Sequence, residues 1–192
     1  MRRTLIAAAA VVLVASSLTL AQARGKSTPA PTNALASNAP AAAKALDDAT
    51  IVAIFDAANT ADIETGRLAK ERGQSKEVRD FGAMLERDHT QVRKLGRDLA
   101  AKLGVTPTPP ADDAGARDHA AALKALRAAS KANFDQAFLH HEVAFHKSVI
   151  DAVTTTLLPA IKNGELKELV TTVAPAFQAH MLAADALSKK LK

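Results

Sequence analysis

The chain has 192 residues, of which 48% are apolar and 3% aromatic, and it contains no cysteine, tryptophan or tyrosine. This length suits a single globular domain. The absence of cysteine excludes a disulfide scaffold, a thiolate metal site and a cysteine nucleophile. The formal net charge is +5, but the 25 basic and 20 acidic residues are interspersed along the chain. No nucleic-acid partner is therefore expected.

The N-terminus has the pattern of a secretory signal peptide, which we assign to residues 1–23. Arg2 and Arg3 precede an apolar run over residues 5–14, and residues 21–23 have the small-x-small form of a signal-peptidase site. The run is shorter than the roughly 20 apolar residues that a spanning helix needs. We predict cleavage after this site and no membrane span in the mature chain; a retained anchor is the alternative. The mature protein is expected in the periplasm or in association with the outer membrane.

The composition changes twice after the signal. Residues 24–46 are rich in Ala, Pro, Ser and Asn without apolar periodicity, which predicts a disordered linker. Over residues 47–192 the apolar positions follow helical spacing, and no stretch alternates with the period of a strand. The fold class predicted for this domain is all-α.

Helix boundaries follow from start and stop residues. Ser75 is a candidate N-cap, and Gly73, Gly104 and Asn163-Gly164 are candidate stops. The helices are predicted over residues 48–72, 75–102, 117–129, 131–158 and 165–190. Short connections on either side of one long, proline-rich crossover that carries the short helix indicate a four-helix bundle with the layout of ferritin-like folds.

Polar residues interrupt the apolar stripe of each long helix near its middle. An ionised carboxylate is almost never buried unless it is paired or bound to a metal, so these residues are expected to meet in one layer of the core. The candidate metal ligands are Asp62, Asp88, His89, Glu142, His146 and His180. Carboxylates and imidazoles that converge in this way bind divalent metals such as iron, manganese or zinc. The alternative is a hydrogen-bonded network that fixes helix register without a ligand.

Several other features are expected to be structural. His119, His140 and His141 are predicted to be solvated, and Glu64 is predicted to face away from the layer. Thr154, Thr155 and Thr156 are interpreted as the frayed end of a helix, and Pro175 is expected to bend the last helix. The chain has no glycine-rich phosphate loop, no Gly-x-Ser-x-Gly elbow and no His-Glu-x-x-His helix.

Several short motifs in order resemble one bacterial family. These are Asn59-Thr60-Ala61-Asp62 with Gly66, Met84 before Asp88-His89-Thr90, Gly104-Val105-Thr106, Phe134-Asp135 with His146, and Pro175 before His180. Over residues 49–191 the chain resembles an exported ferritin-like family, domain of unknown function 4142, which is sometimes described as an outer-membrane protein. The resemblance implies a four-helix ferritin-like domain behind a signal peptide, and no established reaction.

The candidate ligands depart from the usual di-iron set. Ferritin-like carboxylate proteins supply Glu-x-x-His from two helices, whereas the last helix here offers Phe177-x-x-His180. This favours a mononuclear metal or none. The leading hypothesis is an exported, non-enzymatic helical module with a role in stress, whose polar layer is structural or binds a small ligand. The alternatives are a metalloprotein and a surface-interaction protein that uses residues 24–46.

Overall fold

The computed structural model describes residues 46–191, and all regular secondary structure in this part of the chain is helical. The all-α class is therefore confirmed. The signal peptide and nearly all of the linker lie outside the described residues. The elements in chain order are α1 (Asp48–Arg72), α2 (Lys76–Leu103), α3 (Ala114–Ala128), α4 (Lys131–Ala152), η1 (Val153–Leu157), α5 (Leu158–Ala160) and α6 (Gly164–Lys190).

The helix starts and stops are set by the residues that the sequence marks. Asp47 caps α1 by accepting a hydrogen bond from the Thr50 amide at 2.8 Å. Ser75 caps α2, and Asn163 caps α6 in the same way. Gly104 ends α2 with φ 65°, a left-handed conformation that glycine adopts without steric cost.

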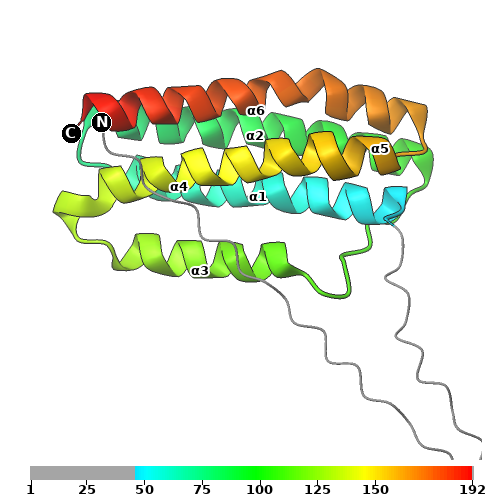
Figure 1. Ribbon diagram of the computed structural model, residues 1–192, viewed down its shortest axis with the longest axis horizontal. Helices are drawn as coiled ribbons and strands as arrows, with labels where there is room; N and C mark the ends of the chain where they lie inside the picture. Colours follow the sequence, from blue (N-terminus) through cyan, green and yellow to red (C-terminus); the bar gives the residue numbers. More distant parts are fainter. Residues whose placement is uncertain (1–45, 192) are drawn as a thin grey trace, which may run out of the picture. The chain divides into compact units, whose positions relative to one another are not determined.

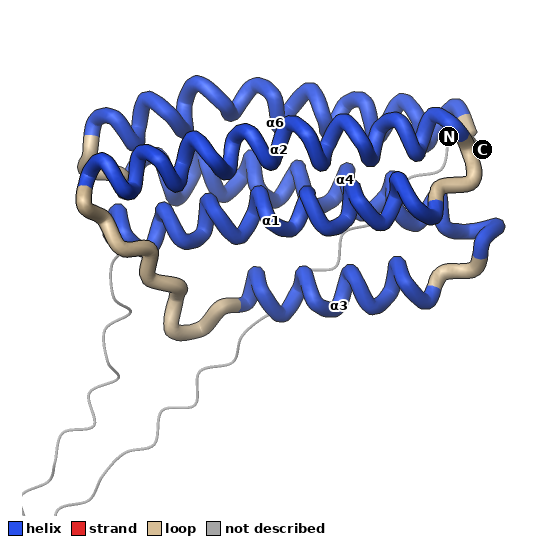
Figure 2. The backbone as a smooth tube through the Cα atoms, turned by 180° about the vertical axis from the view of Figure 1, so that it is seen from behind, coloured by secondary structure: helices blue, strands red, loops and turns tan. Residues whose placement is uncertain are grey.

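The four long helices α1, α2, α4 and α6 lie side by side, with α3 outside them along α1 and α4 (Figure 1). The connection between α2 and α3 forms the predicted long crossover (Figure 2). Arg72 holds the end of this crossover in place, because its guanidinium donates to the carbonyl oxygens of Leu126, Arg127 and Ala129. The layout is a helical bundle built from two antiparallel hairpins, α1–α2 and α4–α6.

Two helix boundaries differ from the prediction by more than one residue. The short helix begins three residues early, because Asp113 accepts a hydrogen bond from the Ala116 amide and so acts as its N-cap. The helix predicted over residues 131–158 changes to π-helical geometry at η1 rather than fraying. Within it, Thr154 and Thr155 donate hydrogen bonds back to the carbonyl oxygen of Asp151.

The core consists of two apolar clusters, one toward each end of the bundle. One contains Val78, Phe81, Leu85, Phe134, Phe138, Leu139 and their neighbours. The other contains Ile51, Val52, Phe55, Leu157, Leu166, Val170 and their neighbours. Every buried carboxylate and imidazole of the described chain falls on the helix segments between these clusters.

Close contact between α1 and α2 requires glycine. A Cβ on Gly82 would lie 2.6 Å from the carbonyl oxygen of Gly66, and a Cβ on Gly66 would lie 2.7 Å from that of Gly82. Farther along, Gly96 faces Phe55, whereas the neighbouring Leu95 is 45% exposed. The side chain of Leu95 therefore lies outside the core.

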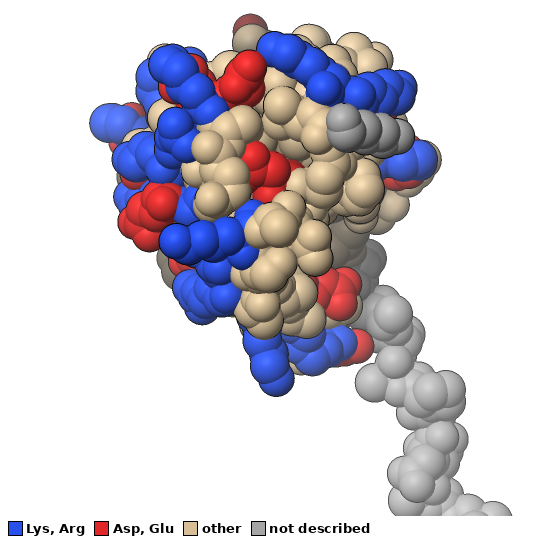
Figure 3. All heavy atoms as spheres, turned by 90° about the vertical axis from the view of Figure 1, so that its left-hand side faces the viewer, with Lys and Arg blue, Asp and Glu red and all other residues tan. Residues whose placement is uncertain are grey.

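The surface matches the mixed charge of the sequence. Lysine and arginine side chains gather on the face seen in Figure 3, with acidic side chains among them. Several of these charges form exposed ion pairs, among them Lys190 with Glu77 at 3.0 Å. Among the described helices, none is long and apolar enough to cross a membrane.

Candidate metal centre

A layer of polar side chains fills the middle of the bundle, with at least one residue from each long helix. α1 supplies Asn59 and Asp62, and α4 supplies Glu142 and His146, each pair lying on one helix face because of its spacing. α2 and α6 supply one residue each, His89 and His180. Their exposed fractions range from 0% to 6%.

The orientation of the His89 ring is fixed by Asn59. The Asn59 Nδ2 donates to the carbonyl oxygen of Phe55 at 2.8 Å, so its Oδ1 is left as an acceptor. That Oδ1 lies 3.0 Å from His89 Nδ1, which therefore carries the proton. The Nε2 of His89 is left with an unprotonated lone pair.

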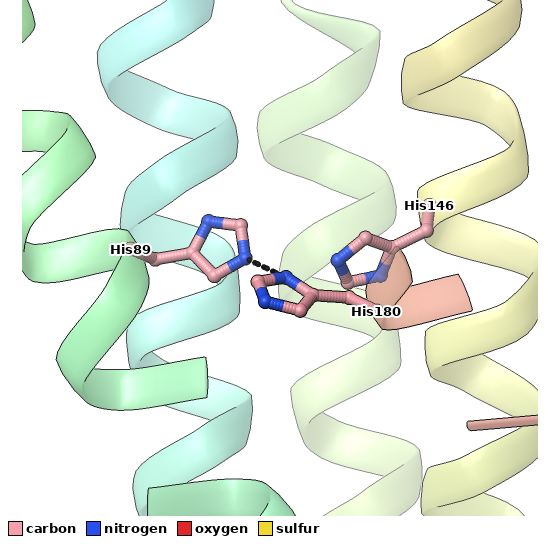
Figure 4. A group of neighbouring side chains, drawn as sticks. All are labelled: His89, His146 and His180. Carbon is pink, nitrogen blue, oxygen red and sulfur yellow. Dashed lines mark hydrogen bonds between the residues drawn. The ribbon is translucent and has the colours of Figure 1, made fainter. Parts of the chain in front are cut away.

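The His180 ring is fixed by a carboxylate at the edge of the layer. Its Nε2 lies 3.3 Å from Asp88 Oδ2, and Asp88 also accepts a hydrogen bond from Arg87 at 2.9 Å. A carboxylate held by a guanidinium is an acceptor, so the His180 Nε2 carries the proton and its Nδ1 carries a lone pair. This Nδ1 lies 3.1 Å from His89 Nε2 (Figure 4).

His146 presents a third lone pair to the same space. Its Nδ1 donates to the carbonyl oxygen of Glu142 at 3.0 Å, and its buried Nε2 has no hydrogen-bond partner. One ring nitrogen from each of His89, His146 and His180 lies within 4.8 Å of the other two. We call these three residues the histidine triad.

Protonation of the triad is unfavourable. Burial, together with the smaller effect of the neighbouring His146 and His180 rings, lowers the pKa of His89 to about 2. Burial also lowers the pKa of His180, although Asp88 opposes that shift. Phe177 closes the site, with its ring 5.1 Å from that of His89 between centroids.

Two buried carboxylates lie beside the triad. All four carboxylate oxygens of Asp62 and Glu142 lack a hydrogen-bond partner. Asp62 Oδ1 lies 3.8 Å from His146 Nε2, and Glu142 Oε2 lies 3.4 Å from His146 Nδ1. Burial raises the pKa of Asp62 well above its usual value, and the Glu142 carboxyl raises it further. Asp62, Glu142 and His146 form a second potential ligand group, which we call the carboxylate triad.

The structure brings five of the six predicted ligands together. The exception is Asp88, whose side chain is 34% exposed and which contacts the layer through His180. Asn59 was not predicted to take part. Its position three residues before Asp62, on the same helix face, is the signal that could have indicated it.

Of the three histidines predicted to be solvated, one is exposed and two are partly covered. His140 is exposed, as predicted. His119 is 19% exposed, because it bonds Glu64 at 2.9 Å where α3 packs on α1. His141 is partly covered, and burial lowers its pKa.

This fold and site define an all-helical bundle with a buried layer of imidazoles and carboxylates. The chain belongs to the family described as domain of unknown function DUF4142, whose model matches residues 32–187. The predicted family is thereby confirmed.

Two solved structures have a similar fold. The structure described as CopM in the Cu(II)-bound form shares 16% identity at a TM-score of 0.60, covering 77% of this chain and 100% of that one. A DUF305 fragment from Deinococcus radiodurans shares 14% identity at a TM-score of 0.65, covering 74% of this chain and 95% of that one. At these identities the likeness concerns the fold alone. No curated protein sequence matches the chain.

Proposed function

We infer that this protein binds a transition-metal ion between the imidazoles of the histidine triad. The observation that carries this function is the contact between His89 Nε2 and His180 Nδ1, where the ring partners leave two lone pairs facing each other at 3.1 Å. Two lone pairs repel at this distance unless a cation lies between or beside them. A metal ion is the better occupant, because it can be ligated by all three ring nitrogens at once and its charge can be offset by the adjacent carboxyl groups of Asp62 and Glu142.

Asn59, Asp88 and the Glu142 carbonyl oxygen serve this centre by orienting the rings. Ligating histidines usually donate their other ring N–H to such acceptors, which fixes the tautomer and the ring position. Each member of the histidine triad has an acceptor of this kind at 3.0 to 3.3 Å.

A purely structural layer is the competing function. It would require that the polar groups satisfy each other, yet five buried atoms of Asp62, Glu142 and His146 have no partner. An unsatisfied buried group costs about 1 to 3 kcal/mol, and more when it is charged. The unpaired atoms therefore favour a bound cation over a self-contained network.

The ligand atoms limit which metal ions can bind at this site. Imidazole suits zinc, copper, iron and nickel, and two buried carboxylates balance the charge of one divalent ion. Copper is a good first candidate because the structurally similar CopM was solved in a Cu(II)-bound form. Zinc, iron and manganese remain to be compared with it. The small number of bridging carboxylates favours a binding role over oxygen-activating catalysis.

Export is part of the proposed function. The N-terminal pattern of residues 1–23 supports secretion to the periplasm or envelope, where a metal-binding module would meet incoming ions. N-terminal sequencing of the secreted protein tests this, with Arg24 as the expected first residue. An intact Met1 in the membrane fraction would contradict cleavage. A stress-related role and envelope association through residues 24–46 stay predictions.

The metal proposal is tested on untagged protein. Titration of the chelator-treated chain with Cu²⁺ or Zn²⁺ should saturate at one ion per chain. At a free metal concentration 100 times the Kd, the melting temperature should rise by roughly 5 to 11 °C, from about 2.7 kcal/mol of linkage. The His180→Leu variant should lose both the tight binding and the metal-dependent rise.

The matched control is His140→Leu, because His140 is an exposed histidine on α4. It should bind metal as the unmodified protein does. If His180→Leu is destabilised by about 1 to 3 kcal/mol and chelator changes nothing in either protein, the layer is structural and the metal proposal fails. An unchanged melting temperature in all samples would refute both functions.

A further inference from the structure

The polar layer contains two overlapping ligand groups that differ in chemistry. The histidine triad offers three ring nitrogens, whereas the carboxylate triad offers carboxylate oxygens from Asp62 and Glu142 and a ring nitrogen from His146. Within each group the ligand atoms lie within 4.8 Å of one another. His146 belongs to both groups, so the two groups are neighbouring parts of one site.

The carboxylate triad also favours binding of a cation, independently of the histidine triad. Its four oxygens and the Nε2 of His146 are buried without hydrogen-bond partners. A buried carboxylate pair needs a bound cation or a shared proton, and a cation can in addition use the lone pair of His146 Nε2. The histidine triad supplies little counter-charge. The hydrogen bonds of its N–H groups go to Asn59, Asp88 and the Glu142 carbonyl oxygen, and the two ring nitrogens nearest the carboxylates stay 3.4 Å from them.

We propose that this layer holds one divalent ion at a time in one of two subsites, chosen by the metal's ligand preference. Zn²⁺ or Cu²⁺ binds in the histidine triad, and Mn²⁺ binds in the carboxylate triad. The proposal rests on the proposed function, since it takes the histidine triad as the subsite for the softer metal. Imidazole nitrogens favour copper and zinc, and carboxylate oxygens favour manganese.

Two observations make the subsites mutually exclusive. The Nδ1 of His146 is used by the Glu142 carbonyl oxygen, so the ring has one lone pair to give and can ligate one ion. The charge of the two carboxylates also limits the layer to one divalent ion. When Asp62 and Glu142 are both ionised, their two negative charges balance one divalent ion. Both side chains are 0% exposed, so a second divalent ion would leave two positive charges uncompensated in the core.

The experiment compares Mn²⁺ and Zn²⁺ on the same chelator-treated full domain. Bound Mn²⁺ loses the sharp electron paramagnetic resonance lines of the free ion, so those lines report its release. One Mn²⁺ should bind per chain, and one equivalent of Zn²⁺ should release it completely. Retention of both metals together would overturn the exclusivity.

Variants separate the two subsites. Glu142→Gln should weaken Mn²⁺ at least 100-fold and Zn²⁺ less than 10-fold, whereas His180→Leu should weaken Zn²⁺ at least 100-fold and leave Mn²⁺ within about 3-fold. Glu168→Gln, an exposed change on α6, should alter neither. Circular dichroism melting of each variant checks that it folds, and His89→Gln provides a second test of the histidine triad with the same expected pattern as His180→Leu.

Three further results would overturn the proposal. The first is equal loss of both metals in Glu142→Gln and in His180→Leu, which would indicate a single shared site. The second is the absence of saturable Mn²⁺ binding while Zn²⁺ binds, which would leave the proposed function intact. The third is the absence of both Zn²⁺ and Cu²⁺ binding, which would refute the proposed function as well.

Discussion

Acidification should destabilise the metal-free protein through one buried ring, that of His89. Its pKa is about 2 in the folded chain against an ordinary value of 6.5, so below pH 6.5 the unfolded chain binds a proton that the folded chain does not. A group whose pKa is lower in the folded state than in the unfolded state decreases the free energy of unfolding as the pH falls. At about 1.36 kcal/mol per pH unit, lowering the pH from 7 to 5 should cost about 2 kcal/mol through His89 alone.

The assay is urea unfolding at pH 7 and pH 5 with chelator present. The unmodified protein should lose about 2 kcal/mol more between these pH values than the His89→Gln variant, whose side chain does not titrate. His180 also has a lowered pKa, but it is present in both proteins. The exposed His140→Gln is the control and should keep the full pH dependence. Equal losses in the unmodified protein and His89→Gln would refute the account of a buried, neutral His89.

Two further predictions concern the fold. Gly82→Ala should lower the free energy of unfolding by about 1 to 3 kcal/mol, because the new Cβ would lie 2.6 Å from the Gly66 carbonyl oxygen; Gly115→Ala, which makes ordinary contacts, should not destabilise. Asp135→Ala should cost about 1 to 2 kcal/mol, since its carboxylate accepts hydrogen bonds at 2.8 Å from the two amides that precede α2. Asp80→Ala, an exposed change on α2, should cost less than about 0.5 kcal/mol, and urea unfolding measures all four.

Most of the helical framework could be predicted because its signals are local. Cap residues such as Ser75 and Asn163 lie within three residues of the amides they bond, so sequence spacing is enough to find them. The π-helical turn at η1 was missed. Its three threonines are equally compatible with a frayed helix end, and the local sequence pattern does not separate the two.

The candidate site was predicted to within one turn of each helix, but its internal roles were not. The apolar stripe of α2 placed Asp88 in the core beside His89, whereas packing turns the helix so that His89 is buried and Asp88 lies at the edge. A rotation of one residue is within the tolerance of a 3.6-residue pattern. The spacing of Asn59 from Asp62 could have placed it in the layer, but its role as the acceptor for His89 depends on a residue 30 positions away in sequence, which no local pattern specifies.

The layer also draws its ligands from both helical hairpins. His89 comes from α1–α2, while His146 and His180 come from α4–α6, and Asp62 and Glu142 divide in the same way. A bound ion in either triad would therefore cross-link two halves of the chain that are otherwise held by side-chain packing, by hydrogen bonds near the helix ends and by the α3 crossover. The metal site is complete only when the two hairpins are packed against each other. If the chain is cut within the crossover, the two fragments should therefore bind each other more tightly when the ion is present.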